Sequence, residues 1–273
     1  MRMINRESYT PKGTVFLVGA GPGDPDLITV RGLNAIKKAE VVVHDRLANP
    51  ELLSNAPENA EKIYVGKQPD KASVSQAQIN RILIAKANEG KTVVRLKGGD
   101  PFIFGRGGEE CEALVEENIL FEIIPGISSS MAAPAYAGIP LTHRGKARSF
   151  TVVTGYTKDK KHLFDNWEHI AYSDTIVVLM GMKNLSEIVG RLTNFGRSPQ
   201  TPVAVIESAT YTNQKTVIGT LATIVGKVSG LKPPATIVIG ELAALGNKLA
   251  WFKEPAEASD HQYVIKQQKI VAG

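Results

Sequence analysis

The chain has 273 residues, of which 43% are hydrophobic and 22% are charged, and this composition excludes a mostly disordered protein. Its net charge of +5 favours an anionic partner, whereas the low aromatic content of 6%, with no basic runs interleaved with aromatics, argues against a nucleic-acid-binding surface. We expect a small or medium-sized polyanionic ligand, no nucleic acid and, since no apolar run reaches about 18 residues, no membrane span.

Cysteine usage and the N-terminal residues predict the compartment. The single cysteine, Cys111, cannot form an internal disulfide, and no spaced Cys/His set would hold a metal ion. Residues 1–13 lack the apolar core of a secretory signal. The sequence therefore predicts a soluble, cytoplasmic protein without a bound metal.

Four short apolar runs in the first half each end in a polar or glycine-rich turn. Together with the amphipathic segments between them, they predict a mainly parallel sheet covered by helices. The expected strands are residues 14–21, 39–45, 91–100 and 120–126, and a helix is expected from its cap at Ser75 to Gly90. Ligands of such sheets bind beyond the carboxyl ends of the strands, so the turns there are the expected binding rim.

The turn after the first strand, "GAGPGD" at residues 19–24, looks at first like a dinucleotide-binding loop. A Rossmann fingerprint needs a third glycine where this chain has Asp24, and Pro22 replaces a possible N–H donor. A carboxylate beside a pyrophosphate is unfavourable. The turn is therefore poorly suited to NAD.

Asp45 ends the second expected strand and has three open interpretations. It stands where a Rossmann protein carries its ribose-binding acid, it could be a catalytic base facing the cleft, and it could cap the turn before Pro50. Spacing alone does not choose among them.

The stretch "VVRLKGGDPFIFGRGGEE", residues 93–110, contains many glycine and charged residues directly after the third expected strand. Its glycine pair would allow close approach of a ligand, and Asp100 can accept hydrogen bonds from an amine or a hydroxyl. A helix is expected to open at Gly107 or Gly108, so that the glutamates at 109 and 110 fall in its first turn, where a capping role is an equal alternative for Glu110. The planar guanidinium of Arg106 suits a carboxylate or a phosphate.

The segment at residues 123–144 reads as a strand, a glycine turn and a helix of small residues. Ser128 and Ser129 are expected to cap that helix or to donate to a ligand at the rim. His143 and Arg144 follow on a polar segment, where Arg144 offers a further contact for an anion.

Five further apolar runs follow from about residue 148. They cover residues 149–155, 174–181, 201–208, 215–221 and 235–241. They predict a second α/β domain with more β pairing. The expected organisation is an N-terminal extension over 1–12, a first α/β domain over 13–143, a second over 144–249 and a C-terminal tail over 250–273.

Several motifs together resemble one known family. They are "VGAGPGDPDLIT", "VVVHDRL", "VGK", "VRLKGGDPFIFGRGGEE", "PGISS", "AGIPLTHR", "VVLMGM" and "PATIVIGE", in this order. This set is similar to that of the uroporphyrinogen-III C-methyltransferases of the tetrapyrrole methylase superfamily. The resemblance implies two α/β domains with a cleft between them, a homodimer, and S-adenosyl-L-methionine-dependent methylation of uroporphyrinogen III, twice and via precorrin-1, to precorrin-2 in sirohaem or cobalamin biosynthesis.

The same resemblance implies roles for individual residues. Asp45 would be the proton acceptor and Lys67 the proton donor. The implied cofactor contacts are Pro22, Gly98, Gly99, Asp100, Ile103, Ser128, Ser129, Met180 and Ala209. The basic side chains of Arg46, Arg106 and Arg144, with Glu109 orienting Arg106, are the expected substrate contacts, and S-adenosyl-L-homocysteine is the expected by-product.

The chain departs from the family pattern at Tyr156, where histidine is frequent, and at Lys215, where arginine is frequent. Three alternatives remain at this point. They are a methyltransferase acting later on the corrin route, an NAD-linked dehydrogenase and a tetrapyrrole carrier without catalysis.

Overall fold

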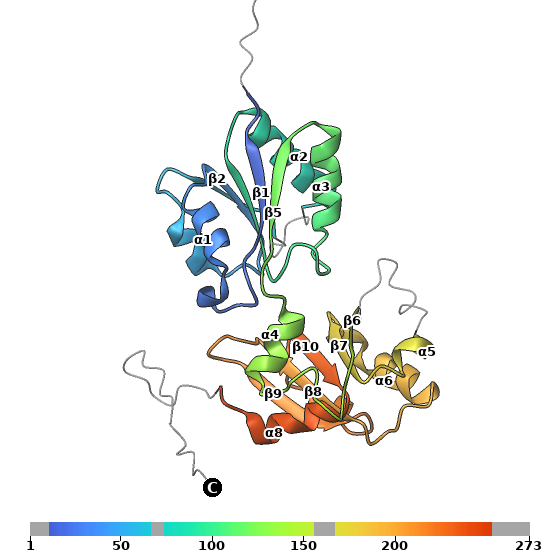
Figure 1. Ribbon diagram of the computed structural model, residues 1–273. Helices are drawn as coiled ribbons and strands as arrows, with labels where there is room; N and C mark the ends of the chain where they lie inside the picture. The colour runs from blue at the N-terminus through green and yellow to red at the C-terminus, as the bar shows by residue number, and fades with distance from the viewer. Residues whose placement is uncertain (1–10, 67–73, 156–166, 253–273) are drawn as a thin grey trace, which may run out of the picture.

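A computed structural model of the chain describes residues 11–66, 74–155 and 167–252. These residues form two α/β lobes, each built on a five-stranded sheet, and the lobes are stacked end to end in Figure 1. The expected fold class, two α/β domains, is confirmed.

The first sheet is entirely parallel. Its strands are β1 (Thr14–Gly19), β2 (Val41–His44), β3 (Glu61–Tyr64), β4 (Val93–Lys97) and β5 (Leu120–Ile124), in the order β3-β2-β4-β1-β5. All four predicted strands are present. The edge strand β3 was not predicted, because its four residues begin with the exposed pair Glu61 and Lys62 and carry little apolar signal.

Helices cover both faces of the first sheet. On one face, α2 (Gln76–Asn88) and α3 (Gly107–Glu116) bury Leu83 and Leu114 against the strands. On the other face lie α1 (Val30–Ile36) and the short 3₁₀ helices η1 (Pro25–Leu27) and η2 (Pro50–Asn55), with Ile36 and Leu52 in the core. This cover explains why the strands read as continuous apolar runs.

The predicted start of α2 is confirmed in detail. The Ser75 hydroxyl accepts a hydrogen bond from Gln78 N, and the Gln78 side chain accepts one from Ser75 N at 2.7 Å, which is a capping box. Gly90 follows the helix with φ +79°, a conformation that suits glycine.

Replacing Ser75 with alanine is expected to lower the free energy of unfolding by about 1 kcal/mol, because the first turn of α2 loses its cap. Urea denaturation monitored by circular dichroism measures this. Ser186→Ala is the matched control, since Ser186 is an exposed residue inside α6. Equal stability of the two variants would contradict the capping role.

The second sheet is mixed. Its strands are β6 (Phe150–Thr154), β7 (Thr175–Leu179), β8 (Pro202–Glu207), β9 (Lys215–Thr220) and β10 (Ala235–Ile239), in the order β6-β7-β10-β8-β9. Only β6 and β7 pair in parallel, and the other neighbours are antiparallel. All five predicted strands are present, and the additional antiparallel pairing fits the expectation for this half.

Short helices complete the second lobe. They are α5 (Trp167–Ile170), η3 (Met182–Asn184), α6 (Leu185–Asn194), α7 (Ile224–Lys227), η4 (Glu241–Leu245) and α8 (Gly246–Leu249). The largest of them, α6, buries Leu185, Ile188 and Leu192 in a core that also contains Trp167.

Helix α4 (Ser129–Tyr136) links the lobes. It follows β5 of the first sheet, yet Ala133 packs with Ile206 and Val238 of the second sheet. In Figure 1 the helix lies on the second lobe. The packing of the second lobe therefore begins within α4, whereas the sequence pattern put the change at residues 143/144. The exact boundary stays a prediction.

Candidate active site at the rim of the first sheet

The turns after β1, β4 and β5 are joined through their backbones. Gly99 N donates to Gly21 O at 2.6 Å, and Gly21 N donates to Gly99 O at 3.2 Å. A Cβ atom built on Gly19 would lie 2.5 Å from Gly126 Cα, so only glycines allow this approach. The predicted rim is thus one continuous backbone surface.

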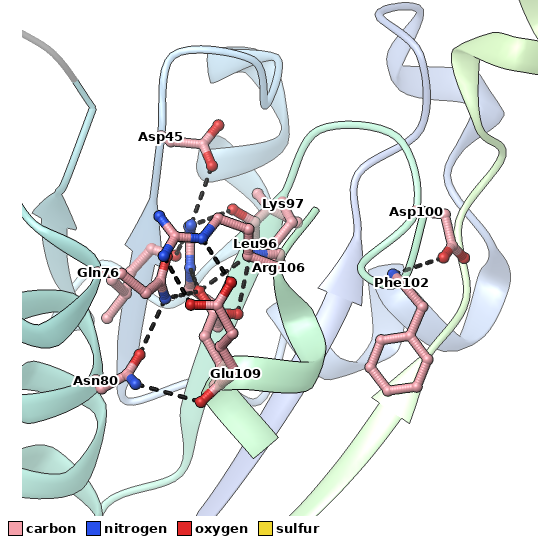
Figure 2. Close-up of polar contacts among 12 residues, drawn as sticks. Asp45, Gln76, Asn80, Leu96, Lys97, Asp100, Phe102, Arg106 and Glu109 are labelled. Atoms are coloured by element: carbon pink, nitrogen blue, oxygen red, sulfur yellow. Dashed lines mark hydrogen bonds and ion pairs between the residues drawn. The ribbon is translucent and has the colours of Figure 1, made fainter. Parts of the chain in front are cut away.

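Asp100 connects two of these turns. Its Oδ2 accepts from Gly126 N at 3.0 Å, and its Oδ1 accepts from Phe102 N at 2.8 Å, the contact drawn in Figure 2. Both carboxylate oxygens therefore hold backbone amides. A ligand that meets Asp100 would find a carboxylate already fixed in orientation.

Gly99 faces the start of α4. It has φ +68°, and a Cβ atom at this position would lie 3.8 Å from Ser128 Cα and 3.9 Å from Ser129 N. Ser128 is buried and caps α4, because its Oγ accepts from Ser130 N at 3.2 Å. The predicted capping role of Ser128 is confirmed, and Ser129 is the first residue of the helix.

Two of the other predicted cofactor residues also lie in the turns of the first lobe. Pro22 stands between Gly21 and Gly23, which both have positive φ. Ile103 is 44% exposed in the turn after Asp100. An apolar side chain this exposed is available to a ligand.

Backbone strain marks the predicted site in both lobes. Among the described residues, six other than glycine have positive φ, and five of them, all but Asn118, lie in segments predicted to bind ligands. These five are Phe104, Arg106, Met180, Ser208 and Thr210. Each such residue costs of order 1–3 kcal/mol, and such residues cluster at binding sites. Ala209, predicted to contact the cofactor, stands between two of them.

The "GPGD" turn docks on the strained segment of the second lobe. Asp24 N donates to Thr210 Oγ1 at 2.9 Å, and Tyr136 donates its hydroxyl to Asp24 Oδ2 at 3.2 Å. Asp24 also caps η1, and α1 begins only at Val30. An α-helix N-terminus therefore does not follow the glycines directly, which agrees with the prediction that this turn is unsuited to a pyrophosphate.

Asp45 belongs to a partly buried charge cluster, which consists of Asp45, Arg95, Lys97 and Glu110. Arg95 Nη2 lies 3.1 Å from Asp45 Oδ2, and Arg95 Nε donates to Glu110 Oε1 at 3.1 Å. Lys97 Nζ donates to the same oxygen at 3.0 Å and lies 2.9 Å from Glu110 Oε2. Figure 2 shows Asp45 at one end of the group and the start of α3 at the other.

Glu110 does more than stabilise a helix terminus. Its side chain is fully buried, with 0% exposure, and lies between two cations. Burial and the neighbouring Arg95 lower the pKa of Lys97, whereas Glu110 opposes that change. Sequence reasoning did not identify Arg95 and Lys97 as part of the site. The signal was present, because charged residues at alternate positions of a buried strand point to the same face.

Arg106 and Glu109 form a bidentate pair. Arg106 Nε and Nη2 donate to the two carboxylate oxygens of Glu109 at 2.8 and 2.7 Å, and both side chains are about half exposed. The predicted orientation of Arg106 by Glu109 is present. A substrate carboxylate would therefore have to use the remaining N–H groups of Arg106 or displace Glu109.

The turn after Asp45 meets two other motifs. Arg46 is exposed, and a Cβ atom on Gly66 would lie 3.0 Å from Arg46 N. A Cβ atom on Gly98 would lie 2.5 Å from Leu47 Cβ. The "HDRL", "VGK" and "GGD" motifs thus come together, although Lys67 itself lies outside the described residues, as does Tyr156.

Arg144 is not brought to the rim by these contacts. It lies on the 142–148 turn. Residues of this turn, among them Arg144 and Arg148, line a surface hollow of about 390 Å³. Arg148 N and Ser149 N donate to Asp174. Lys215, the other departure from the family pattern, is exposed at the start of β9.

Cys111 follows Glu110 in α3 and is buried next to the charge cluster. Burial, followed by the charge of Glu110, raises the pKa of its thiol, which disfavours the thiolate.

Among the described residues, no three His, Cys, Asp or Glu side chains are grouped to hold a metal ion. Within the same residues, no helix has the length and apolar character needed to cross a membrane.

Comparisons with known proteins agree with this geometry. The family model of the Tetrapyrrole (Corrin/Porphyrin) Methylases matches residues 14–225. The chain is 51% identical to a uroporphyrinogen-III C-methyltransferase of Priestia megaterium, over 84% of this chain and 98% of that protein. It is 55% identical to the protein of the same name from Methanocaldococcus jannaschii, over 84% and 96%.

A solved structure gives the same result. The uroporphyrin-III C-methyl transferase from Thermus thermophilus, complexed with S-adenyl homocysteine, superposes with a TM-score of 0.75 at 38% identity, over 85% of this chain and 100% of that one. The fold, the glycine turns and the sequence relatives thus agree, and the chain belongs to the tetrapyrrole methylases.

Proposed function

We propose that the chain transfers methyl groups from S-adenosyl-L-methionine to uroporphyrinogen III, twice and via precorrin-1, and so forms precorrin-2 on the route to sirohaem and cobalamin. The relatives at 51% and 55% identity bear the name of this activity. The observation that carries the proposal is the rim itself, where the glycine turns after β1 and β4 meet the N-terminus of α4 and the Asp45 turn packs against Gly98.

The residues at the rim fit S-adenosyl-L-methionine. Gly99 leaves room in front of Ser128 and Ser129, and the N-terminus of α4 favours an anionic group such as the amino-acid carboxylate of this methyl donor. The exposed side chains of Ile103 and Met180, 44% and 51% accessible, offer apolar contacts. Pro22, Gly98, Asp100 and Ala209 complete the proposed binding set.

The donor, when bound, supplies a methyl group already activated by its sulfonium charge. The chain has to align a ring carbon of the substrate with that methyl group and exclude water. The substrate carbon provides the electron pair of the new C–C bond while the C–S bond breaks, with S-adenosyl-L-homocysteine as the by-product. The methylated ring then loses a proton.

Asp45 accepts that proton in the proposed mechanism. Its side chain is 26% exposed, and both of its oxygens have fixed partners, Leu47 N at 3.0 Å and Arg95 Nη2 at 3.1 Å. A general base held in one orientation on an accessible rim suits this step. Lys67, the residue after Gly66 in the sequence, is proposed as the proton donor.

Basic side chains bind the substrate, whose pyrrole rings carry acetate and propionate groups. The proposed contacts are Arg46, Arg106 with Glu109, and Arg144. Arginine forks bind carboxylates through paired hydrogen bonds. Arg144 lies on a different turn from the other three residues, so it would meet a different part of the macrocycle.

Arg106→Ala is expected to lower methyl transfer to uroporphyrinogen III by about tenfold or more, because a charge-assisted contact with a carboxylate is worth about 1.5–3 kcal/mol. The affinity for S-adenosyl-L-homocysteine, measured by calorimetry, should stay near that of the unmodified chain. Arg191→Ala, which breaks a surface pair with Glu187 on α6, is the control. Unchanged turnover in Arg106→Ala would refute this contact.

Assembly and compartment are part of the proposal as well. The family resemblance implies a homodimer, and the cysteine usage predicts the cytoplasm. Analytical ultracentrifugation of the full chain tests the dimer. A single species with the mass of one chain would contradict the dimer.

Incubation with uroporphyrinogen III and S-adenosyl-L-methionine tests the function directly. After oxidation, the fluorescence of the product separates methylation of uroporphyrinogen III from a later methylation. A titration with S-adenosyl-L-homocysteine against NAD separates a methyltransferase from a dehydrogenase. Binding of uroporphyrinogen III without turnover would instead indicate a carrier.

A further inference from the structure

The buried part of the charge cluster has no direct access to a substrate. Glu110 is 0% exposed, and Arg95 and Lys97 are each 4% exposed at the side chain. Asp45 is the only member with appreciable exposure, at 26%. Asp45 is therefore the side chain through which the three buried residues most directly reach the rim.

Arg95 connects Glu110 to Asp45. Its Nη1 donates to Leu96 O at 3.0 Å and its Nε donates to Glu110 Oε1 at 3.1 Å, which leaves Nη2 for Asp45. Because the guanidinium group is planar, hydrogen bonds from both Nε and Nη1 fix the orientation of its plane. Glu110 thus positions Arg95 Nη2 together with the carbonyl groups of Leu96 and Val43, the latter accepting from Nη1 at 3.4 Å.

Glu110 itself is held by three side chains from two other elements. Its Oε1 accepts from Arg95, from Lys97 and from Gln76 Nε2, the last at 3.2 Å. Its negative charge balances the two buried cations, which would otherwise be unfavourable in this environment. With Asp45 included, the cluster contains two cations and two carboxylates, so its charges cancel.

We propose that Glu110 and Lys97 are positioning residues, which hold Arg95 so that its Nη2 orients and electrostatically balances the carboxylate of Asp45. The inference rests on the proposed function, because it requires Asp45 to accept the proton. It adds a role for charged residues that never touch the substrate.

The alternative is that the cluster only fastens α3 to the sheet. The positioning role and the purely structural role predict different effects on the pH dependence of kcat when a side chain loses its charge but keeps its shape. The charged or titratable groups around Asp45 are His44 and Arg46 on either side of it, Arg95 and Lys97 from β4, and Glu110 from α3. Among the groups that surround Asp45, Glu110 is the one whose charge can be removed with an isosteric amide.

Glu110→Gln is the first test, with kcat measured against pH for methylation of uroporphyrinogen III. The variant leaves Arg95 and Lys97 unbalanced, which favours the carboxylate form of Asp45. The acid limb of the profile is therefore expected to move to lower pH by about 0.5 unit or more. At neutral pH kcat is expected to fall roughly ten- to hundredfold, because the base is misplaced.

The double variant Glu110→Gln/Lys97→Met restores the charge balance around Arg95. Its acid limb is expected to return toward that of the unmodified chain. Glu112→Gln, an exposed position on the same helix, is the matched control and should leave the profile unchanged. Thermal unfolding and S-adenosyl-L-homocysteine binding report whether each variant is folded.

An unmoved acid limb in folded Glu110→Gln, with or without a loss of kcat, would overturn the positioning role. The positioning role would also be overturned if the acid limb of Glu110→Gln/Lys97→Met lay at the same pH as that of Glu110→Gln. Asp45→Asn separates this outcome from failure of the proposed function. If Asp45→Asn keeps full turnover, the proton acceptor itself is wrong; if it is inactive while Glu110→Gln is unshifted, only the positioning role fails.

Discussion

Replacing Asp45 with asparagine is expected to lower the turnover of uroporphyrinogen III to methylated product by about 10²–10⁴-fold, the usual contribution of a general base. Asparagine retains an oxygen that can accept from Leu47 N, but it cannot take up the proton that the methylated ring must lose. Steady-state kinetics of product release, with labelled S-adenosyl-L-methionine as the methyl donor, give this turnover. The affinity for S-adenosyl-L-homocysteine should change little, because the proposed cofactor residues lie on other turns.

The control for this variant is Asp26→Asn, which changes an exposed carboxylate in η1. It should retain the turnover of the unmodified chain. Full turnover in Asp45→Asn would remove Asp45 from the mechanism, and an equal loss in Asp26→Asn would point to a general effect of charge at the rim.

Gly99→Val is expected to weaken S-adenosyl-L-homocysteine binding by about a hundredfold or more, since a misfitting side chain in a close-packed site costs several kcal/mol. The Cβ atom would point at the start of α4, 3.8 Å from Ser128 Cα, and a branched side chain would occupy the space proposed for the cofactor. The positive φ of +68° adds a backbone cost of about 1–2 kcal/mol. Isothermal titration calorimetry measures the affinity.

Gly196→Val separates these two effects. Gly196 has φ +88°, and a Cβ atom there would meet nothing within 4 Å. This control should lose stability to a similar extent and keep its cofactor affinity. If Gly99→Val binds S-adenosyl-L-homocysteine as tightly as Gly196→Val does, the cofactor lies elsewhere.

Much of the fold could be predicted because its signals are local. The capping box at Ser75, the glycine stop at Gly90 and the apolar runs of nine strands depend on neighbouring residues alone. The strand β3 was missed because its pairing with β2, rather than its own residues, stabilises it. The packing of α4 was not predicted either, because a helix of small residues carries no sign of the sheet that it will cover.

The site could be predicted only in part, for a related reason. The pairing of Arg106 with Glu109 follows from a separation of three residues at the start of a helix. The cluster around Glu110 depends instead on how α3 lies against β2 and β4, which no spacing in the sequence encodes. The assignments of Met180 and Ala209 came from the family resemblance alone. The positive φ of Met180, and of the two residues that flank Ala209, shows that both segments are strained.

One measurement tests the central claim most directly. The full chain is incubated with uroporphyrinogen III and S-adenosyl-L-methionine carrying a deuterated methyl group, and the tetrapyrrole product is analysed by mass spectrometry. The proposed function predicts a product with two labelled methyl groups, preceded by a singly labelled intermediate. An unlabelled tetrapyrrole, with S-adenosyl-L-methionine bound but not consumed, would contradict it.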